Sequence, residues 1–314
     1  MAGRRRRQIP ANRGDHPRLR RHLRHNRRLE QRRQHQKRPV RPTGAGPTSK
    51  SGPARQTYKQ RSLPMTDSPD SPLNGKVLYA FGDSIIDGHL YTRRSCVNVV
   101  AEREGLTLVK AARNGATIRY STVTGGLGGQ ILQQAELIGV DQPKPDVIIF
   151  NGGANDAWPE TIPAYLGAVG EAKDPAELDL NTYAGCFEAT ILAFRRHWPD
   201  VPIVYLAVAK IGRDWAVQNY LRQVQLAACA KWGVTVADVF GDTDLDARNE
   251  DMRVRYSFDM IGTDGLPGTP ETAVYPDPDV HPSGTHPNLA GIDRYYAPII
   301  TKALRKALGV GLGD

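Results

Sequence analysis

Short apolar runs that few polar residues interrupt recur between residues 76 and 239. They are rich in β-branched residues, which pack well on a pleated surface, and nearly continuous hydrophobicity is typical of strands covered on both faces. We therefore predict five buried strands, at residues 76–81, 106–112, 146–151, 202–208 and 234–239.

Longer amphipathic stretches alternate with these runs. Within residues 181–197, Tyr183, Phe187 and Ile191 recur at spacings of four, which marks one face of a helix. Alternating strands and helices favour right-handed crossovers and a parallel sheet. The predicted fold class is therefore α/β, a flavodoxin-like three-layer α/β/α arrangement around a five-stranded parallel sheet. Further helices are predicted at residues 92–104, 129–139, 214–232 and 288–308.

Residues 240–285 interrupt this alternation with many glycines, prolines and aspartates, and residues 158–180 form a shorter excursion. A loop this long inside a compact domain is usually functional or disordered. Ligand sites of doubly wound sheets lie at the carboxyl ends of the strands. We therefore expect residues 240–285 to be a long loop insertion near the active site of a domain that spans residues 65–314.

Charge is distributed unevenly along the chain, whose net charge is +9. Residues 1–64 contain 20 lysines and arginines against two acids, whereas the other 250 residues contain 22 basic and 31 acidic residues. The first segment has too few apolar residues to offset the entropy of ordering, so we predict that residues 1–64 form a basic disordered extension. Two alternatives are association with nucleic acid through this arm alone, and a true start of the protein at Met65.

The cysteines are three in number and widely spaced inside apolar helical patterns: Cys96, Cys186 and Cys229. An odd count without the spacing of a metal site suggests reduced, buried thiols and a cytoplasmic protein. The N-terminal segment lacks the apolar stretch of a secretory signal, and no run of 18 apolar residues occurs. We therefore expect no association with a membrane.

Small polar motifs follow three of the predicted strands, and a fourth opens the last helix. Because the carboxyl ends of parallel strands meet at one edge of a sheet, these motifs are expected to lie close together. They are Gly-Asp-Ser at 82–84, Asn-Gly at 114–115, Gly-Ala-Asn-Asp at 153–156 and His-Pro-Asn-Leu-Ala-Gly at 286–291.

An acyl-transfer site needs a hydroxyl at a strand-to-helix turn, a base within hydrogen-bond reach, and donors for a developing oxyanion. Ser84 supplies the hydroxyl. Its own N–H, the Gly115 N–H and the Asn155 amide supply three donors, and glycine at 115 lets the backbone approach a substrate closely. The alternative interpretation is that Ser84 and Asn155-Asp156 merely cap helices.

Four histidines follow residue 64, and two of them suit the role of base. His197 ends a helix away from the strand ends, and His89 is expected at the start of the first helix. His281 and His286 remain, and each precedes a proline.

These four motifs, in this order, resemble the four blocks of the SGNH hydrolases, also called GDSL esterases/lipases. The resemblance covers residues 76–308. It implies that Ser84 is the nucleophile, that Ser84, Gly115 and Asn155 form the oxyanion hole, and that His286 is the general base. His286 is preferred to His281 because only His286 carries the downstream Pro-Asn-x-x-Gly.

The resemblance further implies a serine esterase without metal or other cofactor. Its substrates are expected to be small acyl esters, for example acetyl esters, on a small molecule or a carbohydrate. Alternatives are a catalytically weak ligand-binding module with the same fold, or nucleic-acid association through residues 1–64.

The sequence departs from the family at the residue that orients the base. The family places an aspartate three residues before the catalytic histidine, where this chain has Ser283 before His286 and Pro278 before His281. Asp277 and Asp279 lie nearby, and Asp279 is the candidate third member of the triad. Alternatively, a backbone carbonyl or the Ser283 hydroxyl accepts the imidazole Nδ1–H, leaving a Ser-His dyad.

Two other segments suggest ligands only weakly. Residues 124–130 are glycine-rich but lack the lysine and spacing of a phosphate-binding loop, so we predict a flexible loop. The acidic residues at 241–251 follow no calcium-loop spacing, and we interpret them as a solvated loop.

Overall fold

The computed structural model describes residues 70–88, 94–120, 128–139, 141–157, 165–257 and 284–311, and the backbone at 261–262 and 273–274. The predicted basic extension, residues 1–64, therefore lies outside the described residues. The same is true of five residues weighed above for the site, namely His89, Asp277, Asp279, His281 and Ser283.

The described residues form a five-stranded parallel sheet in the order β2-β1-β3-β4-β5. This order is that of flavodoxin-like doubly wound sheets, so the predicted fold class is confirmed. The chain leaves β1 for one edge and returns to pair β3 with the other side of β1, which makes the β1–β3 boundary the topological switch point. The strands are β1 (Val77–Phe81), β2 (Thr107–Lys110), β3 (Val147–Phe150), β4 (Ile203–Ala207) and β5 (Thr235–Asp238).

Side chains of each strand alternate between two hydrophobic cores, one on either face of the sheet. In β1, Leu78 and Ala80 belong to one core, whereas Tyr79 and Phe81 belong to the other. All four side chains are buried. This double burial explains why the predicted strands are apolar at nearly every position.

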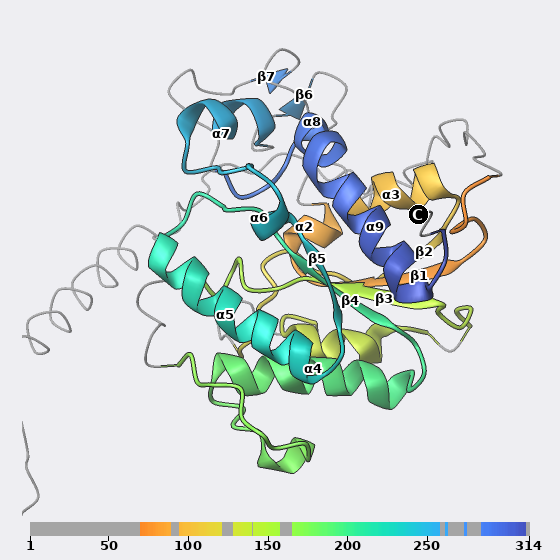
Figure 1. Cartoon of the computed structure of the whole chain (residues 1–314), viewed down its shortest axis with the longest axis vertical. Helices are drawn as coiled ribbons and strands as arrows, with labels where there is room; N and C mark the ends of the chain where they lie inside the picture. The colour runs from red at the N-terminus through yellow and green to blue at the C-terminus, as the bar shows by residue number, and fades with distance from the viewer. Residues whose placement is uncertain are drawn as a thin grey trace, which may run out of the picture. The chain divides into compact units, whose positions relative to one another are not determined.

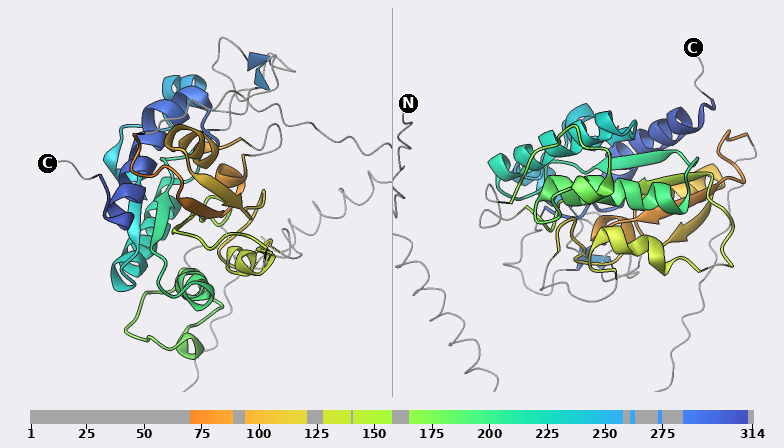
Figure 2. Two further views of the ribbon diagram at one scale, coloured as in Figure 1. Left: turned by 90° about the vertical axis from the view of Figure 1, so that its right-hand side faces the viewer. Right: turned by 90° about the horizontal axis from the view of Figure 1, so that it is seen from below.

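Helices cover both faces of the sheet (Figures 1 and 2). The first core packs against α3 and α9, and the second against α4, α5 and the 3-10 helix η1. No helix in the described part of the chain is long and apolar enough to cross a membrane. These helices are α3 (Cys96–Glu104), η1 (Ile131–Leu137), α4 (Tyr183–His197), α5 (Trp215–Lys231) and α9 (Ala297–Leu308).

The predicted helix at 288–308 consists of three consecutive segments. They are α8 (Leu289–Gly291), a π-helical turn η3 (Ile292–Tyr296) and α9. Pro298, in the first turn of α9, has no N–H to donate to the preceding turn. A local π-turn accommodates that missing bond without ending the helix.

Residues 240–285 contain more regular structure than the predicted loop. α6 (Val239–Asp242) enters the segment, α7 (Glu250–Tyr256) lies within it, and β6 (Ile261–Gly262) pairs with β7 (Ala273–Val274). Asn249 caps α7 by accepting the Met252 N–H, the first turn contains acidic residues, and the last turn contains basic ones. These are ordinary helix-start and helix-end signals, which the glycine and proline content of the surrounding sequence masked.

Candidate active site

The turn after β1 is built around Gly82. Its φ angle is +147°, a conformation that side-chain-bearing residues rarely adopt. A Cβ at this position would lie 1.9 Å from Asn151 Oδ1, so there is no room for one. Glycine is therefore required here by both the backbone conformation and the neighbouring side chain.

Two buried amide side chains fix this turn. Gln134 Oε1 accepts the Gly82 N–H at 2.7 Å, and Gln134 Nε2 donates to the Gly82 carbonyl at 2.8 Å. Asn151 Oδ1 accepts the Asp83 N–H at 3.1 Å, and Asn151 Nδ2 donates to Asp83 Oδ1 at 2.7 Å. Both amides are 0% exposed, so these bonds are shielded from competition with water.

Neither amide was among the predicted site residues. Asn151 carried a recognisable signal, because it is a polar residue at the end of an apolar strand. Gln134 carried none, since its partner Gly82 lies 52 residues away in the sequence.

Asp83 caps the short helix α2 (Ser84–Asp87), because its Oδ1 accepts the Ile85 N–H at 2.9 Å. The carboxylate is fully buried, and Oδ2 has no hydrogen-bond partner in the described part of the chain. Burial raises the pKa of Asp83, although the Asn151 amide, the Ile85 N–H and the charge of His286 oppose that shift. The capping role that was weighed for Ser84 thus belongs to Asp83.

The Ser84 hydroxyl instead meets the predicted base. Ser84 Oγ lies 2.7 Å from His286 Nε2, although 202 residues separate the two in the sequence. Ser84 is 7% exposed. A hydrogen bond of this length suits proton transfer from a serine nucleophile to a histidine base.

The loop after β2 is tied to the end of β3 by both residues of the Asn155-Asp156 pair. Asn155 Nδ2 donates to the Ala116 carbonyl at 3.0 Å, which places Asn155 beside Gly115, whose φ angle is +78°. Asp156 accepts the N–H groups of Ile118 and Arg119 at 3.0 Å each. Asp156 therefore holds a neighbouring loop, whereas the sequence suggested that it caps a helix.

The Asp156 carboxylate is 7% exposed and meets little water. Burial raises the pKa of Asp156 to about 6, against the opposing effect of the Ile118 and Arg119 N–H groups. The Asp156 carboxylate, which holds this loop, is therefore expected to titrate near pH 6.

The Pro-Asn-x-x-Gly spacing after His286 has a structural explanation. Asn288, which is 0% exposed, accepts the Gly291 N–H at 2.9 Å and donates to the Arg255 carbonyl at 2.9 Å. A Cβ on Gly291 would lie 2.8 Å from the Tyr256 carbonyl oxygen. Asn288 and Gly291 thus dock the histidine segment onto the end of α7.

The other titratable candidates lie apart from this contact. His197 Nε2 is 3.2 Å from Glu136 Oε1 at the far end of α4. The three cysteines are free and buried, and burial raises the pKa of Cys96 and Cys229 to about 12 and of Cys186 to about 11. Such thiols carry little thiolate at neutral pH, so they are poor nucleophiles.

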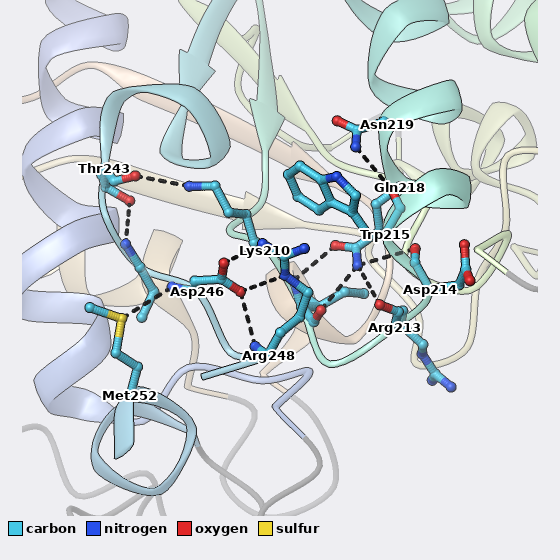
Figure 3. Close-up of polar contacts among 12 residues, drawn as sticks. Lys210, Arg213, Asp214, Trp215, Gln218, Asn219, Thr243, Asp246, Arg248 and Met252 are labelled. Carbon is cyan, nitrogen blue, oxygen red and sulfur yellow. Dashed lines mark hydrogen bonds and ion pairs between the residues drawn. The ribbon is translucent and has the colours of Figure 1, made fainter. Parts of the chain in front are cut away.

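The acidic segment after α6 is engaged in local contacts (Figure 3). Asp246 forms an ion pair with Arg248, whose guanidinium stacks 3.8 Å from the centre of the Trp215 ring. Lys210 Nζ donates to the Thr243 carbonyl at 3.0 Å. No cluster of three His, Cys, Asp or Glu side chains suited to a metal ion occurs among the residues that the structure describes.

Solved structures share this fold at low sequence identity. One aligns with a TM-score of 0.54 and 16% identity over 74% of this chain and 98% of its own. A Lactobacillus plantarum protein aligns with a TM-score of 0.51 and 17% identity, over 75% and 97% of the two chains. For a possible lipase from Chitinophaga pinensis the TM-score is 0.49 and the identity 18%, over 75% and 99%.

Sequence comparison identifies the family. A search among curated protein sequences gives no match. Residues 80–294 match the GDSL-like lipase/acylhydrolase family, and this range contains all four motifs described above. Because the match covers more than half of the sequence, the chain belongs to the GDSL-like lipase/acylhydrolase family.

Proposed function

We propose that this protein is a serine esterase that hydrolyses small acyl esters through an acyl-enzyme intermediate. The observation that carries the proposal is the 2.7 Å contact between Ser84 Oγ and His286 Nε2 at the carboxyl edge of the sheet. Membership of an acylhydrolase family supports a reaction on esters.

In the proposed reaction, Ser84 Oγ attacks the ester carbonyl while His286 Nε2 accepts the hydroxyl proton. The tetrahedral intermediate then collapses: the bond to the alcohol oxygen breaks, and His286 returns the proton to the departing alcohol. Water repeats the sequence on the acyl-enzyme, releasing the carboxylic acid and restoring Ser84. A Ser-His pair without a strong third member still supports this route at a reduced rate.

The proposed oxyanion hole consists of the Ser84 N–H, the Gly115 N–H and the Asn155 side-chain amide. Ser84 opens α2, where an N–H has no partner within the helix. One proton of the Asn155 amide is directed at the Ala116 carbonyl, which leaves the second for the substrate oxygen. Preorganised donors of this kind typically contribute a factor of about 10² to 10³ each to turnover.

The proposed substrates carry a small acyl group such as acetyl, on a small molecule or a carbohydrate. The proline-, glycine- and aspartate-rich segment 240–285 suits a polar substrate better than a long acyl chain. For the third member of the triad, Asp279 stays a prediction.

The test is hydrolysis of p-nitrophenyl acetate under rapid mixing. Wild-type protein is expected to release a burst of p-nitrophenolate equal to the enzyme concentration, and Ser84→Ala to lose the burst and at least about 10³-fold in turnover. Ser71→Ala serves as control, because Ser71 bonds Glu104 through its hydroxyl, away from the Ser84–His286 contact. Full activity in Ser84→Ala would refute the assignment of the nucleophile.

The alternatives make different predictions in the same experiments. A ligand-binding module with this fold would bind esters saturably without turnover, whereas loss of measurable turnover in His286→Ala would argue against it. Nucleic-acid association through residues 1–64 predicts salt-sensitive binding that deletion of those residues abolishes.

A further inference from the structure

The backbone on either side of His286 is held by a single buried hydroxyl. Ser257 Oγ accepts the Gly284 N–H at 3.0 Å and donates to the His286 carbonyl at 3.3 Å. Ser257 is the C-cap residue of α7 and is 3% exposed. Its two bonds therefore bracket the peptide that carries the imidazole, in an environment where water does not compete for them.

The last turn of α7 holds the following residues as well. The Asn288 N–H donates to the Tyr256 carbonyl at 2.9 Å, and Ser257 forms an isolated antiparallel bridge with Pro287. Together with the Asn288 side chain, these contacts fix the histidine segment from residue 284 to residue 288 against one helix end.

The segment that leads into α7 is in turn anchored beside the carboxyl end of β4. The Ala247 N–H donates to the Lys210 carbonyl at 2.8 Å, and the Asp246 N–H lies 3.4 Å from the Met252 sulfur (Figure 3). The Gly212 N–H also donates to the Gly284 carbonyl at 3.1 Å. A continuous set of contacts thus joins the sheet to His286 through α7.

We propose that Ser257 is a positioning residue for the general base, which it holds against the end of α7. The inference rests on the proposed esterase function. Its physical basis is that proton transfer needs Ser84 Oγ and His286 Nε2 within about 2.6–3.2 Å, and that a misplacement of about 1 Å costs about 10²-fold in rate.

The test compares Ser257→Ala with Ser257→Thr, which restores a hydroxyl at the same atom. We expect Ser257→Ala to lower kcat for p-nitrophenyl acetate about 10- to 100-fold with KM changed less than about threefold, since the histidine acts on the reaction and not on binding. Ser257→Thr is expected to recover most of that loss. Thr190→Val is the control, because Thr190 is also buried and its hydroxyl donates to the Cys186 carbonyl within α4.

A second measurement does not depend on turnover. The imidazole resonances of His286, assigned by their absence in His286→Gln, are expected to shift and broaden in Ser257→Ala and to stay unchanged in Thr190→Val. Three results would each overturn the inference: a kcat of Ser257→Ala within twofold of the wild-type value, unchanged His286 resonances in Ser257→Ala, or a kcat of Ser257→Thr that does not recover. An inactive wild-type protein would count against the esterase proposal alone, because the resonances would still report whether Ser257 holds the base.

Discussion

The two halves of the candidate site are constructed differently. The Ser84 turn continues directly from β1 and is fixed by buried side chains from η1 and the end of β3, namely Gln134 and Asn151. The His286 segment belongs to no strand and is fixed mainly through its backbone, by Ser257 and Asn288 at the end of α7. The nucleophile turn therefore directly continues a strand of the sheet, whereas the base is held to the sheet through α7.

This difference predicts how substitutions in each half affect stability and turnover. Changes at the nucleophile turn disturb the buried end of the sheet, so they should lower stability and turnover together. Changes at the base segment should lower turnover more than stability, because they loosen contacts at the periphery of the core. Gly82→Ala and Asn288→Ala, which have the largest and the smallest expected effects, test that contrast, and Asp156→Asn tests the loop that Asp156 holds.

Gly82→Ala should have the largest effect. The new Cβ would meet Asn151 Oδ1 at 1.9 Å, and the φ angle of +147° is unfavourable for alanine. We expect the free energy of unfolding to fall by about 4 kcal/mol, with turnover lost, from overpacking and backbone strain together. Urea denaturation and ester hydrolysis measure both quantities.

Gly75→Ala is the matched control for that variant. Gly75 also has a positive φ, +75°, but a Cβ there meets nothing within 4 Å. Its cost should be limited to backbone strain of about 1 kcal/mol, with turnover unchanged. Equal losses in the two glycine variants would contradict the role assigned to the Asn151 contact.

Asp156→Asn should change how stability depends on pH. The pKa of Asp156 is raised to about 6 in the folded protein from 3.8, so the folded state holds this proton more tightly than the unfolded state does. The stability that protonation contributes is fully present below pH 3.8 and is lost as pH rises through about 6. The asparagine variant does not titrate, so its stability relative to wild type should improve by up to roughly 3 kcal/mol between pH 4 and pH 7.

Urea titrations at several pH values measure this difference. Asp293→Asn serves as control, since half of that side chain, 51%, is exposed and its carboxylate pairs with Arg103 at the surface. A difference between Asp156→Asn and wild type that stays flat from pH 4 to pH 7 would contradict the prediction.

Asn288→Ala should have the smallest effect on stability and a clear effect on turnover. The variant loses the cap of α8 and the bond to the Arg255 carbonyl, which should lower the free energy of unfolding by about 1 kcal/mol. Because residue 288 lies two residues from His286, we expect kcat to fall about 10-fold. Thermal denaturation and steady-state kinetics provide the comparison.

Thr182→Ala removes a similar cap, that of α4, which accepts the Gly185 N–H. It should cost a similar amount of stability and leave kcat unchanged. If both cap variants lowered kcat equally, the proposed separation between core stability and base positioning would fail.

Sequence reasoning located each central strand and the main helices, because periodicity is a local property of the chain. All five strands lie inside their predicted ranges, and the strand order follows the expected doubly wound arrangement. The helix α7 was missed because its short amphipathic pattern lies among glycines and prolines. The predicted helix at 288–308 is confirmed over residues 289–308, but nothing in the sequence indicated its π-helical turn.

The Ser84 and His286 pair was also predictable, since both lie in motifs whose residue types and spacing are visible in the chain. The side chains that hold this pair in place could not be predicted from the sequence. The sequence by itself determined the sheet, its order of elements and the residues that carry the proposed chemistry. Only the tertiary structure decided that Asp83 caps α2, that Gln134 and Asn151 fix the nucleophile turn, and that Ser257 brackets the base. These contacts join residues up to 68 positions apart through side-chain hydrogen bonds, and such bonds leave no periodic pattern in a sequence.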